Sequence, residues 1–498
     1  MKPDTVHHLK PPEKFDYNIA VIGAGSAGLV AAYIAAAVKA RVILIEKHRM
    51  GGDCLNTGCV PSKALIRTTR LIALGKRSPE FGIKRMQTEF DFGDIMDRVQ
   101  AVIKTVAPHD SAERYAGLGV DVATGSARLI SPWTIEISNS YDTRTITARS
   151  IVVAAGARPL IPPIPGLDQT GYLTSDTIWN LRKAPKRLLV LGGGPIGCEL
   201  AQCCARLDIQ VTLIEMAPRL LLREDPEVSS LVEARFRTEG IELKLGHTAK
   251  KFLIENNEKI LLAEHDGKTV RIAFDEVLVA LGRTANVAGY GLEELGVELS
   301  PKKTIQVDAF QATNYPHIFA CGDVSGPYQF THTAAHQAWY AAVNALFGGL
   351  LKFRTDYSTI PWATFTDPEI ARVGLNEQEA KAQGIPYEIS TYDLADLDRA
   401  IADGEAQGFV KVLTVPGKDK ILGVTIAGEH AGDLIAEFIL AMKHKIGLNK
   451  ILGTIHIYPT LTEANKYAAG VWKRGHQPET LLKWLARFHS WRRGTGFF

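Results

Sequence analysis

Two cysteines separated by four residues are the side chains of this sequence best suited to redox chemistry. Cys54 and Cys59 lie in GGDCLNTGCVPSK, the segment from Gly51 to Lys63. A C-x4-C pair at the start of a helix can close into a disulfide, and the helix dipole and Lys63 would lower the pKa of a thiol there. A zinc site would need two further ligands at matching spacing, and none are present. The pair predicts a redox disulfide and no bound metal.

The other four cysteines fit structural positions. Cys198, Cys203 and Cys204 fall on one expected helix, and Cys321 falls in an expected buried strand. A vicinal pair such as Cys203 and Cys204 could bind a soft metal, but small buried hydrophobic side chains are the commoner role for cysteine.

A glycine loop of the dinucleotide-binding type occurs near the start of the chain. Gly23, Gly25 and Gly28 form G-x-G-x-x-G after an expected strand, and Glu46 ends the next strand, 18 residues past Gly28. The glycines permit a tight turn, close approach of a pyrophosphate and close packing of helix on strand. The helix N-terminus favours phosphate, and the carboxylate suits a ribose hydroxyl.

A second loop repeats this pattern with Gly192, Gly194, Gly197 and Glu215. Glu215 would accept hydrogen bonds from an adenosine ribose and repel a 2′-phosphate, so NADH is favoured over NADPH. Arg219 and Arg223 follow closely and weaken that argument, although both are interpreted as solvated surface charges. Two dinucleotide sites imply electron transfer between two carriers, of which a flavin and a nicotinamide are the economical pair.

The elements expected to position these loops are two βαβ units, one from Asn18 to Glu46 and one from Arg187 to Glu215. Further strands are expected at Val120–Leu129, Trp133–Ile137, Ile151–Gly156, Glu276–Gly282 and Ile318–Asp323, with a linker at Pro159–Gly166. From about Tyr357 the glycine loops stop, and strands at Gly408–Val415 and Ile421–Ala427 alternate with an amphipathic helix at Ala431–Lys443. The pattern predicts an α/β fold: two Rossmann-like, doubly wound nucleotide-binding domains followed by an α+β domain.

Composition agrees with a folded chain of roughly three domains. The 498 residues are 46% hydrophobic and 22% charged, which excludes disorder, collagen and coiled coil. A net charge of +3 is too weak to indicate nucleic acid, and six cysteines are too few for a disulfide-stapled secreted scaffold. Ile19–Val38 is uncharged and long enough to span a bilayer, but its glycines divide it into strand, loop and helix. The cytoplasm is the expected compartment.

In five motifs the sequence resembles the class I pyridine nucleotide–disulfide oxidoreductases. GGDCLNTGCVPSK, VVAAGARP, GGGPIGCE, ALGRTAN and IFACGD occur in this order, and the resemblance runs from about Asp16 to Trp472. It implies that the first glycine loop holds FAD and that the second loop and Glu215 hold NAD(P)H. The other residues expected to bind one of these two cofactors are Glu46, Lys63, Gly125, Ala155, Asp323, Thr331, His332 and Gly282. The implied domains are 1–163 and 288–356 for FAD, 164–287 for NAD(P) and 357–498 for dimerisation.

The resemblance also implies a relay and the roles of its residues. NADH would reduce FAD, the flavin would reduce the Cys54–Cys59 disulfide, and the dithiol would reduce the acceptor. Cys59 would face the flavin and Cys54 would meet the acceptor, while Lys63 and Glu199 would form an ion pair beside the flavin. The chain would act as a homodimer, because Tyr458 and Glu463 would complete the active site of the opposite subunit.

The sequence departs from its disulfide-reducing relatives at one position of the implied site. Tyr458 stands where those enzymes carry a histidine base, whereas Glu463 is retained. Tyrosine has an ordinary pKa near ~10, so it is a poor base at neutral pH and a good hydrogen-bond donor. His456 lies two residues away, ~6–7 Å along an extended segment, and is interpreted as structural. Loss of general-base catalysis would slow lipoamide or glutathione turnover by about 10²–10⁴-fold.

Several stretches are similar to mercuric reductase, which can dispense with that base: Arg223–Pro226, Phe365–Ala371 and Ala406–Lys411. No cysteine follows Cys321, so the terminal pair with which mercuric reductases collect Hg(II) is missing. The expected function is therefore an FAD-dependent NAD(P)H oxidoreductase that reduces a metal ion or a thiol/disulfide acceptor, mercuric-reductase-like. The alternatives are a dihydrolipoyl dehydrogenase and a non-catalytic redox-sensing flavoprotein.

A basic amphipathic helix is expected at Pro478–Arg493, beyond the resemblance. Leu481, Leu482, Leu485, Phe488 and Trp484 would share one broad face, and Lys483, Arg487, Arg492 and Arg493 supply positive charge. Such a helix could rest on a membrane surface or on a partner, or pack on its own dimer.

Overall fold

The computed structural model describes residues 10–494, which form two compact units. Unit 1 holds the described residues up to Pro79, Ile83–Leu220 and Phe236–Asp356. Unit 2 holds Glu80–Gly82, Leu221–Arg235 and the described chain from Tyr357 onward. Leu221–Arg235 is thus separated along the chain from the rest of unit 2.

The first sheet of unit 1 carries the first glycine loop. Its strands are β1 (Tyr17–Ile22), β2 (Val42–Glu46), β3 (Val120–Thr124), β4 (Ser126–Ser131), β5 (Thr134–Ser138), β6 (Thr143–Val153) and β17 (Ile318–Ala320). The order is β3-β2-β1-β6-β5-β4, with β17 also paired to β6. β3, β2, β1, β6 and β17 pair in parallel, whereas β4 and β5 form an antiparallel extension on β6.

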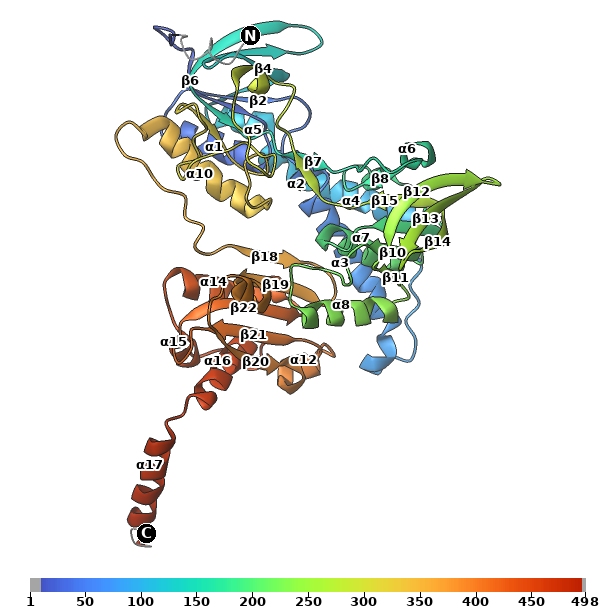
Figure 1. Ribbon diagram of the computed structural model, residues 1–498, viewed down its shortest axis with the longest axis vertical. Helices are drawn as coiled ribbons and strands as arrows, with labels where there is room; N and C mark the ends of the chain where they lie inside the picture. Colours follow the sequence, from blue (N-terminus) through green and yellow to red (C-terminus); the bar gives the residue numbers. More distant parts are fainter. Residues whose placement is uncertain (1–9, 495–498) are drawn as a thin grey trace. The chain divides into compact units, whose positions relative to one another are not determined.

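The parallel strands of this sheet are buried on both faces. Ala20 pairs with Ile43 and Ile151, and these face one hydrophobic cluster; their neighbours along the strands face another. On that second face lie α1 (Ser26–Ala37) and α10 (Thr331–Phe347), which Figure 1 shows side by side. Both helices are rich in buried alanine, and side chains this small let helix and sheet backbones approach closely.

The second sheet of unit 1 carries the second glycine loop. It contains β8 (Leu173–Thr174), β9 (Arg187–Leu191), β10 (Gln210–Glu215), β11 (Glu242–Leu245) and β15 (Glu276–Val279), all parallel, in the order β11-β10-β9-β15-β8. α7 (Pro195–Arg206) follows β9, and α8 (Pro226–Thr238) follows β10. Beside this sheet, β12 (Thr248–Glu255), β13 (Glu258–His265) and β14 (Lys268–Phe274) form an antiparallel meander, and β7 (Ala157–Pro159) pairs with β16 (Arg283–Ala285).

Shorter helical segments complete unit 1. They are α2 (Gly52–Asn56), α3 (Cys59–Lys76), η2 (Ser78–Phe81, partly in unit 2), α4 (Phe92–Val106), η3 (Ala107–Asp110), α5 (Ala112–Gly117), α6 (Leu167–Thr170), η4 (Ile178–Asn180) and α9 (Leu292–Leu295).

Unit 2 is built on an antiparallel sheet. Its strands are β18 (Pro361–Thr364), β19 (Glu369–Gly374), β20 (Glu388–Asp393), β21 (Phe409–Thr414) and β22 (Ile421–Gly428), in the order β18-β19-β22-β21-β20. The helical segments are α11 (Glu377–Ala382), η5 (Leu394–Asp396), α12 (Asp398–Ala402), α13 (Ala431–Leu434), α14 (Ala436–Lys443), α15 (Leu448–Leu452), α16 (Glu463–Gly475) and α17 (Glu479–Arg492). Its hydrophobic cluster includes Val412, Val424, Ile426, Phe438 and Trp472.

The predicted elements are present, but the strand predicted at Ile151–Gly156 runs from Thr143 to Val153, and two other predicted elements are divided. The strand expected at Val120–Leu129 is divided at Gly125, whose φ of +158° takes the chain from β3 into β4. The helix expected at Ala431–Lys443 is divided at Ile435, which keeps helical angles (φ −63°, ψ −19°), so the path of the helix continues. Ile19–Val38 forms β1, the glycine loop and α1, and no helix in residues 10–494 is long and apolar enough to cross a membrane.

Candidate active site

The two cysteines of the C-x4-C segment lie on consecutive helices. Cys54 is in α2, and Cys59 is the first residue of α3, an 18-residue helix whose N-terminal partial charge favours a thiolate. Both cysteines are present as free thiols. The carbonyl of Thr57, between them, accepts a hydrogen bond of 2.8 Å from the Trp179 indole Nε1, which positions the loop. The sequence did not predict this role for Trp179.

Cys59 is the acidic member of the pair. A hydrogen bond from Cys54, one with Thr331 and the nearby charge of Lys63 together outweigh burial and lower the pKa of Cys59 to about 6. The distance from Cys59 Sγ to Thr331 Oγ1 is 3.3 Å. The pKa of Cys54 is raised, because its proton is held in the hydrogen bond to Cys59 and the thiol is partly buried. The reduced pair therefore carries one negative charge at neutral pH, and it is centred on Cys59.

Lys63 and Glu199 meet as an ion pair near Cys59. Lys63 lies one turn after Cys59 on α3, and Glu199 comes from α7 of the second nucleotide-binding sheet. The Lys63 Nζ to Glu199 Oε2 distance is 2.9 Å, and the Glu199 side chain is 9% exposed. A cation fixed in this way lies near Cys59 without losing its own charge partner.

The first glycine loop has the shape that a dinucleotide needs. Gly23 has φ +100°, and a Cβ on Gly28 would come within 1.7 Å of the Gly23 carbonyl oxygen, so neither position accepts a side chain. The Glu46 carboxylate accepts from the amide nitrogens of Ala24 at 2.7 Å and His48 at 2.8 Å. The acid is thus held at the carboxyl edge of the sheet beside the start of α1, where the ribose and pyrophosphate of FAD would fit.

Arg283 connects two acids of this region and was not predicted. Its guanidinium contacts the Asp53 carboxylate, donates to the Ala157 carbonyl at 2.9 Å and lies 3.6 Å from Asp323 Oδ2. Burial raises the pKa of both Asp53 and Asp323, and Arg283 opposes the rise. The signal was present in the ALGRTAN motif, which contains this arginine.

The other residues expected near the flavin lie around the same sheet edge or on α10. The Gly125 amide donates to the Glu46 carbonyl at 2.9 Å, and the Ala155 carbonyl accepts from Asn286 Nδ2 at 2.9 Å. Thr331 begins α10 and contacts Cys59, as described above. The His332 ring stacks on Phe330 with centroids 5.4 Å apart.

The second glycine loop repeats the geometry of the first. Gly192 has φ +108°, and a Cβ on Gly197 would lie 2.0 Å from the Gly192 carbonyl oxygen, whereas a Cβ on Gly194 would meet nothing within 4 Å. The Glu215 carboxylate accepts from the amides of Gly193 and Ala217, each at 2.7 Å. The loop and its acid fit a second dinucleotide.

Gly282, Arg219 and Arg223 are the remaining residues considered in connection with the second dinucleotide. Gly282, with φ +112°, precedes β16, and its carbonyl accepts from the Leu160 amide at 2.9 Å. Arg219 is half-buried, whereas Arg223 is exposed. The Arg223 carbonyl accepts from Asn376 Nδ2 at 2.9 Å within unit 2, so the backbone of this segment is anchored.

Tyr458, Glu463 and His456 belong to unit 2. The Tyr458 hydroxyl donates to Asp398 Oδ2 at 2.9 Å, which raises the pKa of the tyrosine. The Glu463 carboxylate accepts from the Thr460 amide at 3.2 Å and the Tyr467 hydroxyl at 3.1 Å. The His456 side chain is 6% exposed and pairs with Glu437 at 3.0 Å, which supports the structural interpretation of this histidine.

The four other cysteines are buried free thiols. Burial raises the pKa of Cys203 to about 11 and that of Cys321 to about 12, and it also raises the pKa of Cys204. Cys198 donates to the Gly193 carbonyl at 3.3 Å. Protonated thiols of this kind are unreactive, in agreement with structural roles.

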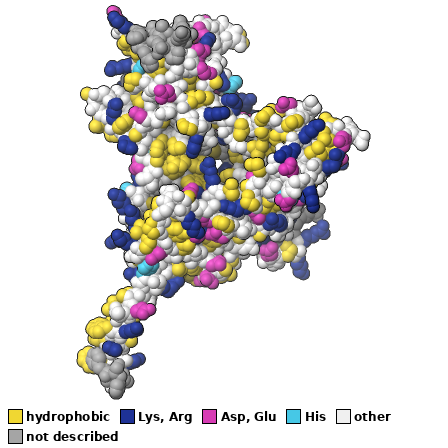
Figure 2. All heavy atoms as spheres, viewed as in Figure 1, with side chains coloured by type: hydrophobic (Ala, Val, Ile, Leu, Met, Phe, Trp, Pro, Cys, Tyr) yellow, Lys and Arg dark blue, Asp and Glu magenta, His cyan; other side chains and the backbone are white. Residues whose placement is uncertain are grey.

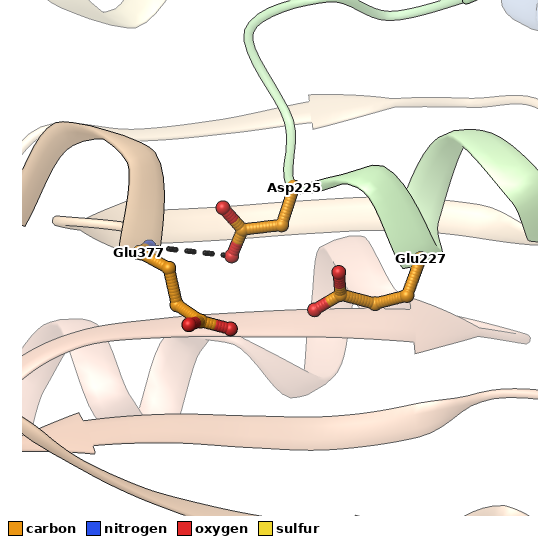
Figure 3. A group of neighbouring side chains, drawn as sticks. All are labelled: Asp225, Glu227 and Glu377. Atoms are coloured by element: carbon orange, nitrogen blue, oxygen red, sulfur yellow. Dashed lines mark hydrogen bonds between the residues drawn. The ribbon is translucent and has the colours of Figure 1, made fainter. Parts of the chain in front are cut away.

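Three carboxylates converge in unit 2, from Asp225, Glu227 and Glu377 (Figure 3). The Lys411 ammonium lies among them, 2.5 Å from Asp225 and 3.1 Å from Glu377, and it also contacts Glu227. The Lys411 side chain is 4% exposed. An ammonium group therefore occupies the position that a cation would take, and the cluster anchors the start of α8 to β21 and α11.

A second buried contact holds the same segment. The Arg372 guanidinium, from β19, lies 3.1 Å from Glu224 and stacks over the Trp362 ring with its carbon 4.1 Å from the ring centroid. The Trp362 indole donates to Glu224 at 2.9 Å. Leu221–Arg235 is therefore an integral part of unit 2, which the sequence did not predict.

Comparisons with known proteins agree with this geometry. The family model described as pyridine nucleotide-disulphide oxidoreductase matches residues 17–338, and that of its dimerisation domain matches residues 360–469. A mercuric reductase of Lysinibacillus sphaericus is 34% identical over 92% of this chain and 84% of its own length. A dihydrolipoyl dehydrogenase of Bacillus subtilis is 33% identical over 91% of this chain and 97% of its own. The Cu(II) complex of RclA, an HOCl-induced flavoprotein disulfide reductase from Escherichia coli, superposes with a TM-score of 0.81 at 25% identity, covering 93% of this chain and 99% of RclA.

Proposed function

This chain belongs to the pyridine nucleotide–disulfide oxidoreductase family, whose cofactors are FAD and a pyridine nucleotide, and we propose that it is an NADH-dependent reductase of thiophilic metal ions. Its nature as a disulfide oxidoreductase follows from the family. That its electron acceptor is a metal ion is our more specific proposal. The similarity to a mercuric reductase supports it, and so does the likeness to RclA, which was solved with Cu(II).

The proposed roles follow from the geometry of unit 1. The first glycine loop, Glu46 and Asp323 would hold FAD, and the second loop with Glu215 would hold NADH. Bound FAD would supply the two-electron transfer between the nicotinamide and the cysteines. Cys59 would hold the thiolate next to the flavin and Cys54 would meet the acceptor, while Lys63, fixed by Glu199, would keep the Cys59 anion stable at neutral pH.

Proton balance is what separates the two acceptor classes. Reducing a disulfide consumes NADH and one proton and yields two thiols, so a group must deliver protons to the departing sulfurs. Reducing a free Hg(II) ion to Hg(0) with NADH releases one proton, and when Hg(II) is bound by two thiols these can leave the metal as thiolates and take up their protons from water, so no protein group must protonate them. A base suited to thiol exchange should have a pKa near neutrality.

Tyr458 is the observation that carries the proposal. It stands in the histidine position of the disulfide-reducing relatives, and its hydroxyl donates to Asp398, which raises its pKa further above neutrality. His456 is paired with Glu437 and is poorly placed to substitute. These two facts favour a metal ion over a disulfide as the acceptor.

A dihydrolipoyl dehydrogenase is the alternative, favoured by the 33% identity to the enzyme of that name. A non-catalytic redox-sensing flavoprotein is a further alternative. The retained cysteine pair and the Lys63–Glu199 ion pair argue against it, and a flavin that NADH fails to bleach would revive it.

The deciding experiment measures NADH oxidation by the purified holoenzyme with Hg(II) in excess thiol and, on the same preparation, with lipoamide. The expected result is rapid turnover with Hg(II) and at least about 10²-fold less with lipoamide. Cys54→Ser should abolish the Hg(II) reaction, whereas the matched control Cys204→Ala should retain it, because that thiol is buried and protonated. Faster turnover with lipoamide would contradict the proposal and establish the dehydrogenase.

The remaining assignments are part of the same proposal. The matched dimerisation domain supports a homodimer, in which Tyr458 and Glu463 would face the cysteines of the opposite subunit. The proposal also includes the domain division at residues 163, 287 and 356, except that Leu221–Arg235 packs within unit 2. It further includes the cytoplasmic compartment, where thiols stay reduced.

A further inference from the structure

The C-terminal helix α17 presents an apolar stripe that is largely exposed among residues 10–494. Every residue of Glu479–Arg492 is at least partly exposed, including Trp484 at 57% and Trp491 at 54%. Figure 1 shows α17 extending beyond α16 as a separate rod. Large apolar side chains left in water in this way indicate a binding surface.

The stripe is continuous along one side of the helix. At 3.6 residues per turn, Leu481, Trp484, Leu485, Phe488 and Trp491 fall on the same face. The rings of Trp484 and Phe488 stack with centroids 5.6 Å apart, and Phe488 and Trp491 lie 6.1 Å apart. The result is a ridge of aromatic rings bordered by leucines.

The opposite side of α17 is basic. Lys483 and Arg487, one turn apart and both exposed, lie there with Glu479, whose carboxylate is 4.0 Å from the Lys483 ammonium. Arg492, three turns after Leu481, falls on the side of the stripe at the C-terminal end of the helix, and Arg493 follows it. Residues 479–493 hold four of the 57 basic and one of the 54 acidic residues, so this segment carries +3 and the rest of the chain no net charge. Figure 2 shows basic side chains next to hydrophobic ones on the visible face of this helix.

The joint before α17 is fixed to unit 2. The His476 ring stacks on Trp472 at 4.3 Å, and its Nε2 lies 2.8 Å from Glu388 of β20. Gln477 and Pro478 then lead into α17. The helix thus starts from a defined position on the folded unit rather than from a long linker.

We propose that α17 binds the surface of an anionic phospholipid bilayer, with its aromatic ridge in the headgroup boundary and its long lysine and arginine side chains reaching the lipid phosphates around the helix. Exposed tryptophans suit this boundary because their rings are amphipathic, and each lysine or arginine adds electrostatic attraction to anionic lipid. A second copy of α17 is a poorer occupant, since two segments of charge +3 would repel. Nucleic acid would use the charge but leave the aromatic ridge exposed.

The test is cosedimentation of the full-length holoenzyme with vesicles of phosphatidylcholine alone or with about 30% phosphatidylglycerol. Binding to the anionic vesicles should be at least about 10-fold stronger and should weaken as salt is raised from about 0.05 M to 0.5 M. Equal binding to both vesicles, or none to either, would overturn the proposal.

Two pairs of variants separate charge from the apolar ridge. Lys483→Glu/Arg487→Glu should reduce anionic-vesicle binding by at least about 10-fold, whereas Lys268→Glu/Lys302→Glu, the same charge change on exposed residues of unit 1, should leave it intact. Trp484→Ser/Phe488→Ser should reduce it similarly, whereas Ala486→Ser should not. NADH oxidation should stay unchanged in all four, which verifies folding.

Three results would overturn the proposal. The unit 1 control could weaken binding as much as the α17 variant, which would indicate only a net-charge effect. The Trp484→Ser/Phe488→Ser variant could keep full vesicle binding, which would indicate a general polyanion site. It could instead elute as a smaller species in gel filtration, which would place α17 against a second copy of the chain.

Discussion

Cys59 is the residue whose chemistry is most completely defined by its surroundings. Cys54, Thr331 and Lys63 all stabilise its anion, from three different positions in the chain. Periodicity and motif spacing place Cys54 and Lys63 beside it, but Thr331 lies 272 residues away, and only the fold brings it within 3.3 Å. A long-range contact of this kind leaves no local signal in the sequence.

The Cys59 thiolate should titrate near pH 6 in the two-electron-reduced enzyme. Its pKa is lowered to about 6, so the anion is present above that pH and is protonated below it. The thiolate–flavin charge-transfer absorbance should therefore fade as the pH is lowered through 6.

Thr331→Val should move the midpoint of this pH titration upward because it removes a hydrogen bond to the anion. Cys59→Ser should keep FAD but lose the band, and a persisting band would assign the thiolate to Cys54.

Tyr458→His should raise lipoamide turnover by about 10-fold or more, because it restores a base with a pKa near neutrality. Steady-state NADH oxidation with lipoamide measures this. Tyr458→Phe serves as the matched control, since it changes the same side chain without adding a base. No gain with histidine would mean that the shape of the pocket, rather than the missing base, limits disulfide reduction.

Glu215→Ala should narrow the preference for NADH over NADPH. The carboxylate is held by two amides at 2.7 Å, in a position where it would repel a 2′-phosphate. The ratio of kcat/KM for the two nucleotides measures this. Glu264→Ala, which changes an exposed residue of β13, is the control. An unchanged ratio in Glu215→Ala would show that this acid does not face the ribose.

At the scale of elements, the glycine loops were the most predictable part of the molecule. A strand, three glycines, a helix and an acid 18 residues on form a local pattern, and both copies fold as that pattern indicates. The division of β3 from β4 was missed because the apolar alternation runs through Gly125, whose positive φ ends the first strand. The role of Leu221–Arg235 was missed for a different reason: its partners lie about 150 to 190 residues away.

Lys411→Met should destabilise unit 2 by about 3–5 kcal/mol, because it leaves the buried Asp225 carboxylate without its cation. Lys381→Met is the matched control, because it removes an exposed lysine that pairs with Glu377, one of the carboxylates around Lys411. It should lower the free energy of unfolding by about 1 kcal/mol or less. Urea unfolding followed by circular dichroism measures both. Equal losses in the two variants would contradict a special role for the buried ammonium.

At the scale of the whole molecule, the dimer is the feature on which catalysis would depend. The dimerisation-domain match covers residues 360–469, and within it Ile455 is 93% exposed and Ile457 77% exposed, directly before Tyr458. Isoleucine side chains that are this exposed in a single chain are well suited to an interface between subunits.

Ile455→Glu/Ile457→Glu should weaken the dimer, because it would bury two charges at the interface. Analytical ultracentrifugation should show a shift toward monomer at micromolar concentration. Acceptor reduction should fall by about 10-fold or more while NADH still bleaches the flavin, since both dinucleotide loops lie in unit 1. Ile254→Glu, which changes an exposed isoleucine of β12, is the control. A double variant that remains dimeric would remove this segment from the interface.

Unit 2 is assembled from stretches that are far apart in the sequence, so its folding depends on the order in which they leave the ribosome. Asp225 leaves the ribosome 186 residues before Lys411, which at common translation rates is a delay of roughly 10–40 s. During that interval Glu224 and Asp225 have no basic partners from β19 and β21. The nascent chain therefore carries two unpaired carboxylates in Leu221–Arg235 until its last third emerges, and this is the stage at which a chaperone would be of most use to it.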